Sequence, residues 1–349
     1  MRVGVRYEGL LERLGGLANQ VPVPIGLSMF GMPIARSVQT AQRLGVFTRL
    51  AERPWRSREL AAELGVREQG LRRLLDVLVA TGVLRLGRDG RYSMPRRVRT
   101  WLDPGSPHYL GDFLADSHHY WEWWGGLEDL VREGRSVELH DRGPDDPYWR
   151  SYITGQYQLA RLSSDAVARV VALAPDARSL LDVAGAHGEF AMALCRRHRQ
   201  LHAMIVDLPG SARIGREIVA AEGMADRVAY VEGDMFEADL GGLHDGALVF
   251  NILHHLTPDR ARALLERVAG VLRPGAPLCV VDLFDRPAGQ PPDSGAYLGL
   301  FFHLTSGADT YSRAETAQWM QACGFGTVRA RTLPQLPGLA ILRAERRAS

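Results

Sequence analysis

The sequence predicts an α/β fold, a mostly parallel sheet with helices on both faces, preceded by a smaller helical domain. From about residue 170 onward, short apolar strands alternate with helical segments. This alternation is typical of a parallel sheet that is covered on both sides. Residues 28–100 show a different order of helix, turn, helix and hairpin. A chain of 349 residues has room for both parts.

The helical part contains a helix expected over residues 57–64, which Ser57 would cap and Gly65 would end. A second helix, EQGLRRLLDVLVATG, carries its leucines on one face. The segment VLRLGRDGRYSMP then alternates in polarity across Asp89-Gly90, which is a strong hairpin signal. Together these elements form the winged-helix pattern.

Composition and charge narrow the classes of partner. The chain has the composition of an ordinary globular protein and a formal net charge of +2. Arginines on the second helix and the hairpin could contact DNA phosphates, but the near-neutral charge favours a dimerisation module over a nucleic-acid partner. No stretch approaches the roughly 20 apolar residues that cross a bilayer, so no membrane partner is expected. The three scattered cysteines predict buried free thiols in a reducing cytoplasm.

We place the N-terminal domain at residues 1–104 and the second domain at residues 105–349. Within the second domain, residues 105–170 are expected to form bridging helices and loops, and residues 171–349 the sheet with its helices. The bridging part is rich in aromatic residues, as in HHYWEWWGG and DDPYWRSY. These side chains belong either to the core or to the wall of a pocket for a flat or apolar substrate.

The end of the first strand of the sheet, SLLDVAG, predicts a ligand-binding turn between Asp182 and Gly188. Ligands of such sheets bind beyond the carboxyl ends of the strands. Small residues around Gly185 would let a ligand approach the backbone, and the helix that follows, from Gly188, offers free N–H groups. The turn by itself would equally suit a nicotinamide cofactor.

Two further carboxylates end the next two strands. Asp207 is placed to accept hydrogen bonds from ribose hydroxyls. Asp234 follows the third strand, and the neighbouring Met235 and Phe236 would pack on the face of an adenine. Together with Asp182, these acids at three consecutive strand ends favour a cationic sulfonium ligand over a pyrophosphate.

The motifs LLDVAGAHGEF, IVDLPG, VEGDMFE, NILHHLTPD and LRPGAPLCVVDLF resemble, in that order, those of plant-type and bacterial small-molecule O-methyltransferases. This group includes the caffeic acid and acetylserotonin enzymes. The resemblance covers nearly the whole chain, because those enzymes also carry an N-terminal winged-helix dimerisation domain. It implies a Rossmann-like class I methyltransferase fold, a homodimer, a small-molecule substrate and S-adenosylmethionine as methyl donor. The implied cofactor contacts are Gly185, Asp207, Leu208, Asp234 and Met235, and we add Asn251 at the start of the fourth motif.

The resemblance also implies a general base at His254. The family has Asp-Trp after this histidine, where the present chain has His255-Leu256. The acid that often orients the base is Asp282, one methylene shorter than the usual Glu. In the simple mechanism His254 takes a proton from a substrate hydroxyl, and Asp282 holds its ring in the right tautomer.

A metal-dependent alternative starts from His303, which stands where the family usually has an apolar residue. His254, His255 and His303 could together hold a zinc or iron ion. An α-keto acid bound to that ion would lose a C–H proton, and its enolate carbon would take the methyl group. This pattern resembles the α-keto acid C-methyltransferases of antibiotic pathways, a branch of the same family. His303 inclines the prediction towards carbon methylation, with metal-free oxygen methylation as the alternative.

Other classes remain open at this point. A DNA-binding regulator would show salt-dependent duplex binding, an inactive partner subunit would bind the cofactor without turnover, and a nicotinamide dehydrogenase would bind NADH. Six further histidines are expected to be surface or structural residues: His118, His119, His187, His198, His202 and His244.

Overall fold

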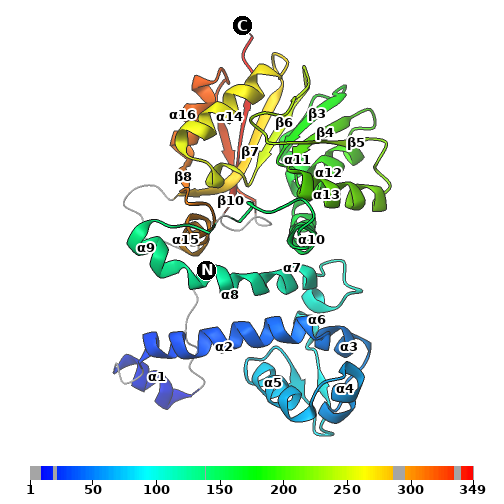
Figure 1. Cartoon of the computed structure of the whole chain (residues 1–349), viewed down its shortest axis with the longest axis vertical. Helices are drawn as coiled ribbons and strands as arrows, with labels where there is room; N and C mark the ends of the chain where they lie inside the picture. Colours follow the sequence, from blue (N-terminus) through cyan, green and yellow to red (C-terminus); the bar gives the residue numbers. More distant parts are fainter. Residues whose placement is uncertain (1–8, 19–21, 138, 286–294, 334–338, 349) are drawn as a thin grey trace. The chain divides into compact units, whose positions relative to one another are not determined.

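The computed structural model describes residues 9–18, 22–137, 139–285, 295–333 and 339–348. Its contacts divide the chain into two compact units, Met1–His118 and His119–Ser349 (Figure 1). The division falls after α7 (Gly111–Asp116), whereas the sequence places the domain boundary near residue 104.

The N-terminal unit contains the predicted order of helix, turn, helix and hairpin, with further helices before and after it. Its helices and strands are α1 (Leu10–Leu17), α2 (Val23–Arg43), α3 (Val46–Glu52), α4 (Ser57–Leu64), α5 (Glu68–Ala80), β1 (Arg85–Leu86), β2 (Tyr92–Ser93), α6 (Arg96–Leu102) and α7. Gly65 ends α4 with a positive φ of 63°, and Gly90 turns the β1–β2 hairpin with a φ of 74°. The cap prediction is wrong by one residue. Ser57 is the first residue of α4, after the N-cap Arg56, and its hydroxyl donates to Glu68.

Apolar side chains on α1 and α2 remain exposed, in contrast to the buried core around α3, α4 and α5. The exposed residues of these two helices are Leu10, Leu11, Leu14, Leu17, Ile25, Leu27, Met29, Phe30, Met32 and Ile34. A patch of this kind usually marks a surface that another protein covers.

The second unit begins with α8 (Tyr120–Gly125), α9 (Leu127–Glu133), α10 (Tyr148–Arg161) and α11 (Ser164–Val171). Its sheet follows the order β5-β4-β3-β6-β7-β10-β9. The strands are β3 (Ser179–Val183), β4 (His202–Asp207), β5 (Val228–Glu232), β6 (Ala247–Phe250), β7 (Pro277–Asp285), β9 (Arg329–Arg331) and β10 (Leu339–Glu345), with β8 (Tyr311–Ser312) paired to β7. β3 to β7 are parallel, and β10 is antiparallel to both neighbours. The mostly parallel sheet is therefore confirmed.

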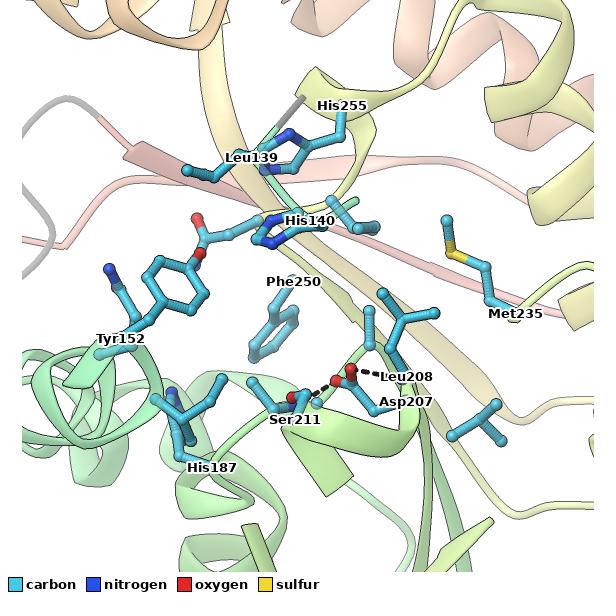
Figure 2. Close-up of a pocket in the computed structure, with 18 of the residues that line it drawn as sticks. Leu139, His140, Tyr152, His187, Asp207, Leu208, Ser211, Met235, Phe250 and His255 are labelled. Atoms are coloured by element: carbon cyan, nitrogen blue, oxygen red, sulfur yellow. Dashed lines mark hydrogen bonds between the residues drawn. The ribbon is translucent and has the colours of Figure 1, made fainter. Parts of the chain in front are cut away.

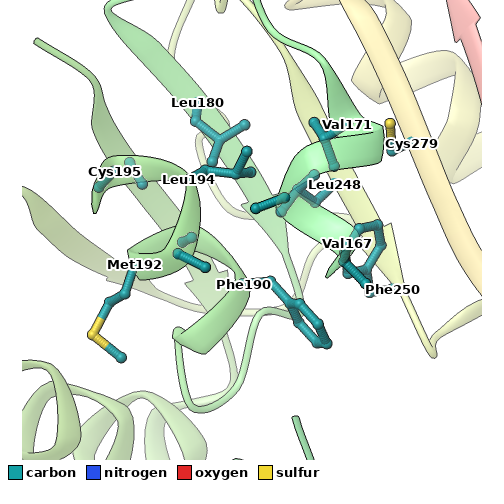
Figure 3. Close-up of a cluster of buried hydrophobic side chains, with 14 of the residues drawn as sticks. Val167, Val171, Leu180, Phe190, Met192, Leu194, Cys195, Leu248, Phe250 and Cys279 are labelled. Atoms are coloured by element: carbon teal, nitrogen blue, oxygen red, sulfur yellow. The ribbon is translucent and has the colours of Figure 1, made fainter. Parts of the chain in front are cut away.

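Helices cover both faces of this sheet because successive strand residues point to opposite sides. The helices that follow the strands are α12 (Glu189–Arg197), α13 (Pro209–Ala221), α14 (Pro258–Gly270), α15 (Gly295–Ser306) and α16 (Arg313–Ala322). Leu180 packs in one buried cluster with α11 and α12, and Leu181 packs in another with α14 and α16. Figure 3 shows the first cluster, in which Val167 and Val171 of α11 lie near Leu248 of β6 and Leu194 of α12 lies near Leu180 of β3.

Strand order creates a switch point between β3 and β6. The chain runs outward from β3 through β4 to β5, and then returns to β6 on the other side of β3. Loops after β3 and β6 consequently leave the sheet in opposite directions and open a crevice at the carboxyl ends.

The three cysteines are free thiols, as predicted, but only Cys195 and Cys279 are buried, whereas Cys323 is partly exposed. No helix within the described ranges is long and apolar enough to cross a membrane.

Candidate active site

A cavity of about 430 Å³ lies at the switch point (Figure 2). The turn after β3, the ends of β4 and β6, and the start of α13 form one part of its wall. Residues from α10, the loop before it, the loops after β5 and β6, α15, and one residue each of α12 and α14 form the rest. Its position agrees with the prediction that strand ends carry the site.

The turn after β3 has a strained backbone. Ala184 and Ala186 have positive φ values of 54° and 45°, in the left-handed region that side chains with a Cβ atom rarely adopt. Gly185 lines the cavity, and a Cβ atom there would lie 2.6 Å from the carboxyl carbon of Asp182. Gly188 is not among the described residues of the cavity wall; it has a φ of 72° and precedes α12 as its N-cap. The predicted turn is thus present, with Gly185 at the wall and Gly188 behind it.

Two carboxyl groups lie under this turn, that of Asp182, which is buried, and that of Asp207, which is half-buried. Asp207 accepts hydrogen bonds from the backbone N–H groups of Ala186 and Leu208, both at 2.7 Å. Burial raises the pKa of Asp207 to about 6, against these hydrogen bonds, which lower it. Asp182 is 1% exposed, and its Oδ2 has no hydrogen-bond partner within the described residues. Burial, and then the charge of Asp207, raise the pKa of Asp182 to about 8. Such a pair favours a cationic or hydrogen-bond-donating ligand in the cavity.

The loop after β5 contributes Asp234 and Met235 to the wall. Asp234 Oδ1 accepts a hydrogen bond of 2.7 Å from the backbone of Phe236. The Phe236 side chain is not part of the described wall; the Arg260 guanidinium lies 4.1 Å from its ring centre. Leu208 and Asn251 line the cavity as well, Asn251 with a positive φ of 54°.

His254 and Asp282 form a buried pair at the end of β6 and β7. His254 Nδ1 lies 2.6 Å from Asp282 Oδ1, and both side chains are 3% exposed. Asp282 also accepts backbone N–H groups from Leu253, at 2.9 Å, and Leu283, at 2.7 Å. The His254 ring stacks on Phe302 of α15, with ring centres 3.7 Å apart. Asp282 is thereby held in one orientation, and it in turn fixes the imidazole.

The two neighbouring histidines differ in exposure to the cavity. His255 lines the cavity, whereas His254 is not among the described wall residues. Their ring centres are 4.2 Å apart, so the buried pair lies directly behind His255. Burial, followed by the neighbouring histidines, holds the pKa of His255 well below its usual range. His255 is therefore an uncharged imidazole at neutral pH.

The three histidines predicted to bind a metal are not brought together as a ligand set. His303 Nδ1 lies 2.8 Å from the carbonyl oxygen of Ala308, and His303 is not among the described residues of the cavity wall. Within the described ranges, no group of three His, Cys, Asp or Glu side chains is arranged to hold a metal ion. The physical reason is that α15 turns His303 towards the loop that follows the helix, while Phe302 takes the place against His254.

Sequence reasoning missed two other histidines in the wall. His187, expected to be a surface or structural residue, is buried and lines the cavity, and its Nδ1 accepts a hydrogen bond from Glu189 N at 3.0 Å. Burial lowers the pKa of His187 to about 4. His140, in the loop before α10, was not singled out at all, and its ring centre lies 5.3 Å from that of His255. About 115 residues separate these two histidines, so no local pattern could have paired them.

Aromatic residues of α10 supply both core and wall. Tyr148 packs in a buried cluster with Trp123, while Trp149 and Tyr152 reach the cavity. Both interpretations of the aromatic-rich segment are therefore partly right.

Two family models match the chain. Residues 124–326 match the O-methyltransferase domain, and residues 28–103 match the O-methyltransferase dimerisation domain. The tetracenomycin polyketide synthesis 8-O-methyl transferase TcmO of Streptomyces glaucescens is 30% identical over 326 residues, which cover 89% of this chain and 94% of that enzyme. Acetylserotonin O-methyltransferase of Mus musculus is 28% identical, covering 86% and 82%.

Solved structures share the fold. Human N-acetylserotonin methyltransferase, solved in complex with S-adenosylmethionine, superposes with a TM-score of 0.83 at 18% identity, covering 99% of this chain and 100% of that one. The structure described as PigF with S-adenosylhomocysteine gives a TM-score of 0.81 at 22% identity, covering 93% and 99%. With both domains matched and a cavity fringed by carboxylates at the switch point, the chain belongs to the O-methyltransferase family and is an S-adenosylmethionine-dependent methyltransferase with a dimerisation domain.

Proposed function

We propose that the protein methylates a hydroxyl group of an uncharged aromatic molecule, with His254 as general base and Asp282 as the residue that orients it. The observation that carries this proposal is the 2.6 Å contact between His254 Nδ1 and Asp282 Oδ1 behind the cavity wall. A carboxylate in this position accepts a hydrogen bond from Nδ1–H, so the proton stays on Nδ1 and the lone pair is on Nε2. Nε2 is then the atom that accepts the proton of the substrate hydroxyl.

The residues under the β3 turn fit the methyl donor. Asp182 is buried, and its Oδ2 has no hydrogen-bond partner among the residues that the structure describes. Together with Asp207 it suits a ligand that carries a positive sulfonium and donates hydrogen bonds from hydroxyl groups. We propose that Gly185, Leu208, Asp234, Met235 and Asn251 complete its site. When bound, S-adenosylmethionine supplies a methyl group that the sulfonium has already activated. The protein contributes alignment of the acceptor, exclusion of water and removal of one proton.

The charge of the wall favours an uncharged acceptor. Arg260 is the one Arg or Lys among the described wall residues, and its guanidinium lies over Phe236, beside the Asp234 loop. Burial lowers the pKa of His187 and of His140 to about 4, so neither carries charge at neutral pH. The carboxylate of an α-keto acid would be buried there without a cation, which is costly.

Carbon methylation with a metal is the second candidate, and the described geometry gives it less support. It requires His303 among the ligands, but the Nδ1 atom of this residue is engaged with Ala308. The names of several relatives also favour oxygen methylation. Among them are the mitomycin biosynthesis 6-O-methyltransferase of Streptomyces lavendulae and the 3-hydroxy-5-methyl-1-naphthoate 3-O-methyltransferase of Streptomyces sahachiroi. One relative, OxyT of Streptomyces rimosus, is an N,N-dimethyltransferase, so the acceptor atom varies among relatives.

We propose a role for this chain in the biosynthesis of an aromatic antibiotic.

Radiolabelled S-adenosylmethionine and a panel of acceptors test the proposal. The panel contains naphthols, hydroxyanthraquinones and phenylpyruvate, each with a chelator and with added zinc or iron. We expect a methoxy product, identified by NMR, from a hydroxyarene in the presence of chelator. Loss of this activity in His254→Ala, with unchanged binding of S-adenosylhomocysteine, would support the base, and His202→Ala on the exposed surface is the matched control. Metal-dependent carbon methylation of phenylpyruvate alone would contradict the proposal.

A further inference from the structure

His187 lies in the turn after β3, and its side chain is held there by α12. Its Nδ1 atom accepts a hydrogen bond of 3.0 Å from the backbone N–H of Glu189, the first residue of that helix. The imidazole also packs against Phe190, with ring centres 5.9 Å apart. His187 is 7% exposed and belongs to the cavity wall. These contacts fix the orientation of the imidazole at the edge of the cavity.

The contact with Glu189 also determines which ring nitrogen carries the proton. A nitrogen that accepts a hydrogen bond from a backbone N–H is unprotonated. Burial lowers the pKa of His187 to about 4, so the ring is neutral at pH 7 and its single proton lies on Nε2. Within the described ranges Nε2 forms no hydrogen bond, yet it is not one of the fully buried polar atoms without a partner. Nε2–H is therefore a donor that remains available to a ligand in the cavity.

The turn places this donor next to the proposed ribose site. His187 follows Ala186, whose backbone N–H donates to Asp207 at 2.7 Å. In Figure 2, Met235 and His187 lie on opposite sides of Asp207. An S-adenosylmethionine molecule with its adenine at Met235 and its ribose at Asp207 would extend its amino-acid group towards His187.

The amino-acid group carries a carboxylate, and the cavity wall offers it neutral donors. Arg260 is the one Arg or Lys among the described wall residues, and it lies over Phe236, at the adenine end of the proposed site. Gln156 of α10 lines the cavity as well, and its amide is a further neutral donor. The ammonium next to the carboxylate supplies the compensating charge, which the carboxylate of an α-keto acid would lack.

We propose that His187 binds the methionine carboxylate of S-adenosylmethionine through a hydrogen bond from Nε2–H. This inference rests on the proposed placement of the cofactor and deepens it. Holding the amino-acid end of the cofactor helps to align the sulfonium, whose methyl group must face the acceptor.

The test uses two ligands that differ only in the carboxylate, S-adenosylhomocysteine and its decarboxylated analogue, and measures their affinities by titration calorimetry. In His187→Asn the amide oxygen can replace Nδ1 and keep the Glu189 contact, but no donor remains at the position of Nε2. In His187→Gln the longer side chain brings an amide NH₂ to that position. The two variants therefore separate the contact with the helix from the contact with the ligand.

We expect His187→Asn to bind S-adenosylhomocysteine about 10- to 100-fold more weakly than wild type, the typical loss of a hydrogen bond to a charged group. Its affinity for the decarboxylated analogue should stay within about twofold of wild type, because the lost contact involves the carboxylate alone. His187→Gln should keep its affinity for S-adenosylhomocysteine within about threefold. Wild-type protein should itself prefer S-adenosylhomocysteine over the analogue by about tenfold or more, a result that does not depend on the folding of any variant.

Thermal unfolding of each variant separates folding from binding. A merely structural role predicts weaker binding in His187→Gln than in His187→Asn, or equal weakening of both ligands, and either result in folded protein would overturn the inference. Unchanged affinity of His187→Asn for S-adenosylhomocysteine, or no preference of the wild type between the ligands, would overturn it and leave the proposed function standing. Binding of S-adenosylhomocysteine that is insensitive to Asp207→Ala would overturn the proposed placement of the cofactor and this inference with it.

Discussion

Replacing Asp282 by asparagine should abolish proton transfer while leaving the protein folded. The carboxylate accepts four N–H groups: Oδ1 faces His254 Nδ1 at 2.6 Å and Leu283 N at 2.7 Å, and Oδ2 faces Leu253 N at 2.9 Å and His254 N at 3.3 Å. In Asp282→Asn the amide oxygen can keep the two bonds at the Oδ2 position. The amide NH₂ then occupies the Oδ1 position and donates to His254 Nδ1, which must give up its proton.

This exchange of tautomers determines the expected magnitudes. Nε2 of His254 now carries the proton and cannot accept another, so kcat should fall by about 10²- to 10⁴-fold, the usual contribution of a general base. Only the Leu283 N–H loses its acceptor, which should cost about 1–3 kcal/mol in the free energy of unfolding. The alternative amide orientation would leave two N–H groups without an acceptor and is less stable for that reason.

Asp245→Asn is the matched control, because Asp245 Oδ2 also accepts two backbone N–H groups, from Arg178 and Ser179, at the opposite end of the strands. In Asp245→Asn the amide oxygen can keep both backbone bonds, and the ion pair of Oδ1 with Arg273 Nε at 3.1 Å is lost. Stability should therefore fall by about 1 kcal/mol or less, and kcat should stay within about twofold of wild type. Initial rates of methyl transfer, titration calorimetry with S-adenosylhomocysteine and urea unfolding measure the three quantities. A kcat in Asp282→Asn above about a tenth of the wild-type value, with unchanged cofactor affinity, would refute the assignment of His254 as a base oriented by Asp282.

Three further predictions address charge, metal and assembly. Burial raises the pKa of the Asp182 carboxyl group to about 8, so the folded, ligand-free protein binds the carboxyl proton more tightly than the unfolded chain does. The free energy of unfolding is therefore highest below the unfolded pKa of about 4, and it falls as the pH rises towards 8. Asp182→Asn should remove up to about 1.4 kcal/mol per pH unit of that slope between about pH 6 and pH 8 in urea unfolding; equal slopes would contradict it. His303→Ala should leave hydroxyl methylation within about threefold of wild type, since its Nδ1 atom is engaged with Ala308, and a severe loss with release of a bound metal would instead support carbon methylation. Phe30→Asp places a charge on the exposed apolar face of α2 and should shift the protein from dimer to monomer in sedimentation; an unchanged dimer would place the interface elsewhere.

Local sequence patterns were sufficient wherever neighbouring residues determine the structure. The alternation of strands and helices, the stop at Gly65 and the turn at Gly90 all depend on backbone preferences within a few residues. The carboxylates Asp182 and Asp207 were found for a related reason. Carboxyl ends of parallel strands meet at one edge of the sheet, so the strand order alone brings them together. The His254–Asp282 pair was predictable only through the family resemblance, because nothing local links a residue that follows β6 with one on β7.

The sequence by itself thus determined the fold class, the edge of the sheet that carries the site and the acids that fringe it. Only the tertiary structure decided which histidines face the cavity. His255 faces it while its neighbour His254 lies behind the wall, His303 turns to the Ala308 carbonyl, and His140 arrives from a loop far away in the chain. Whether an imidazole reaches a cavity depends on the packing of α10 and α15 against the strand ends, and that packing is set by contacts between distant segments, which no periodicity along the chain records.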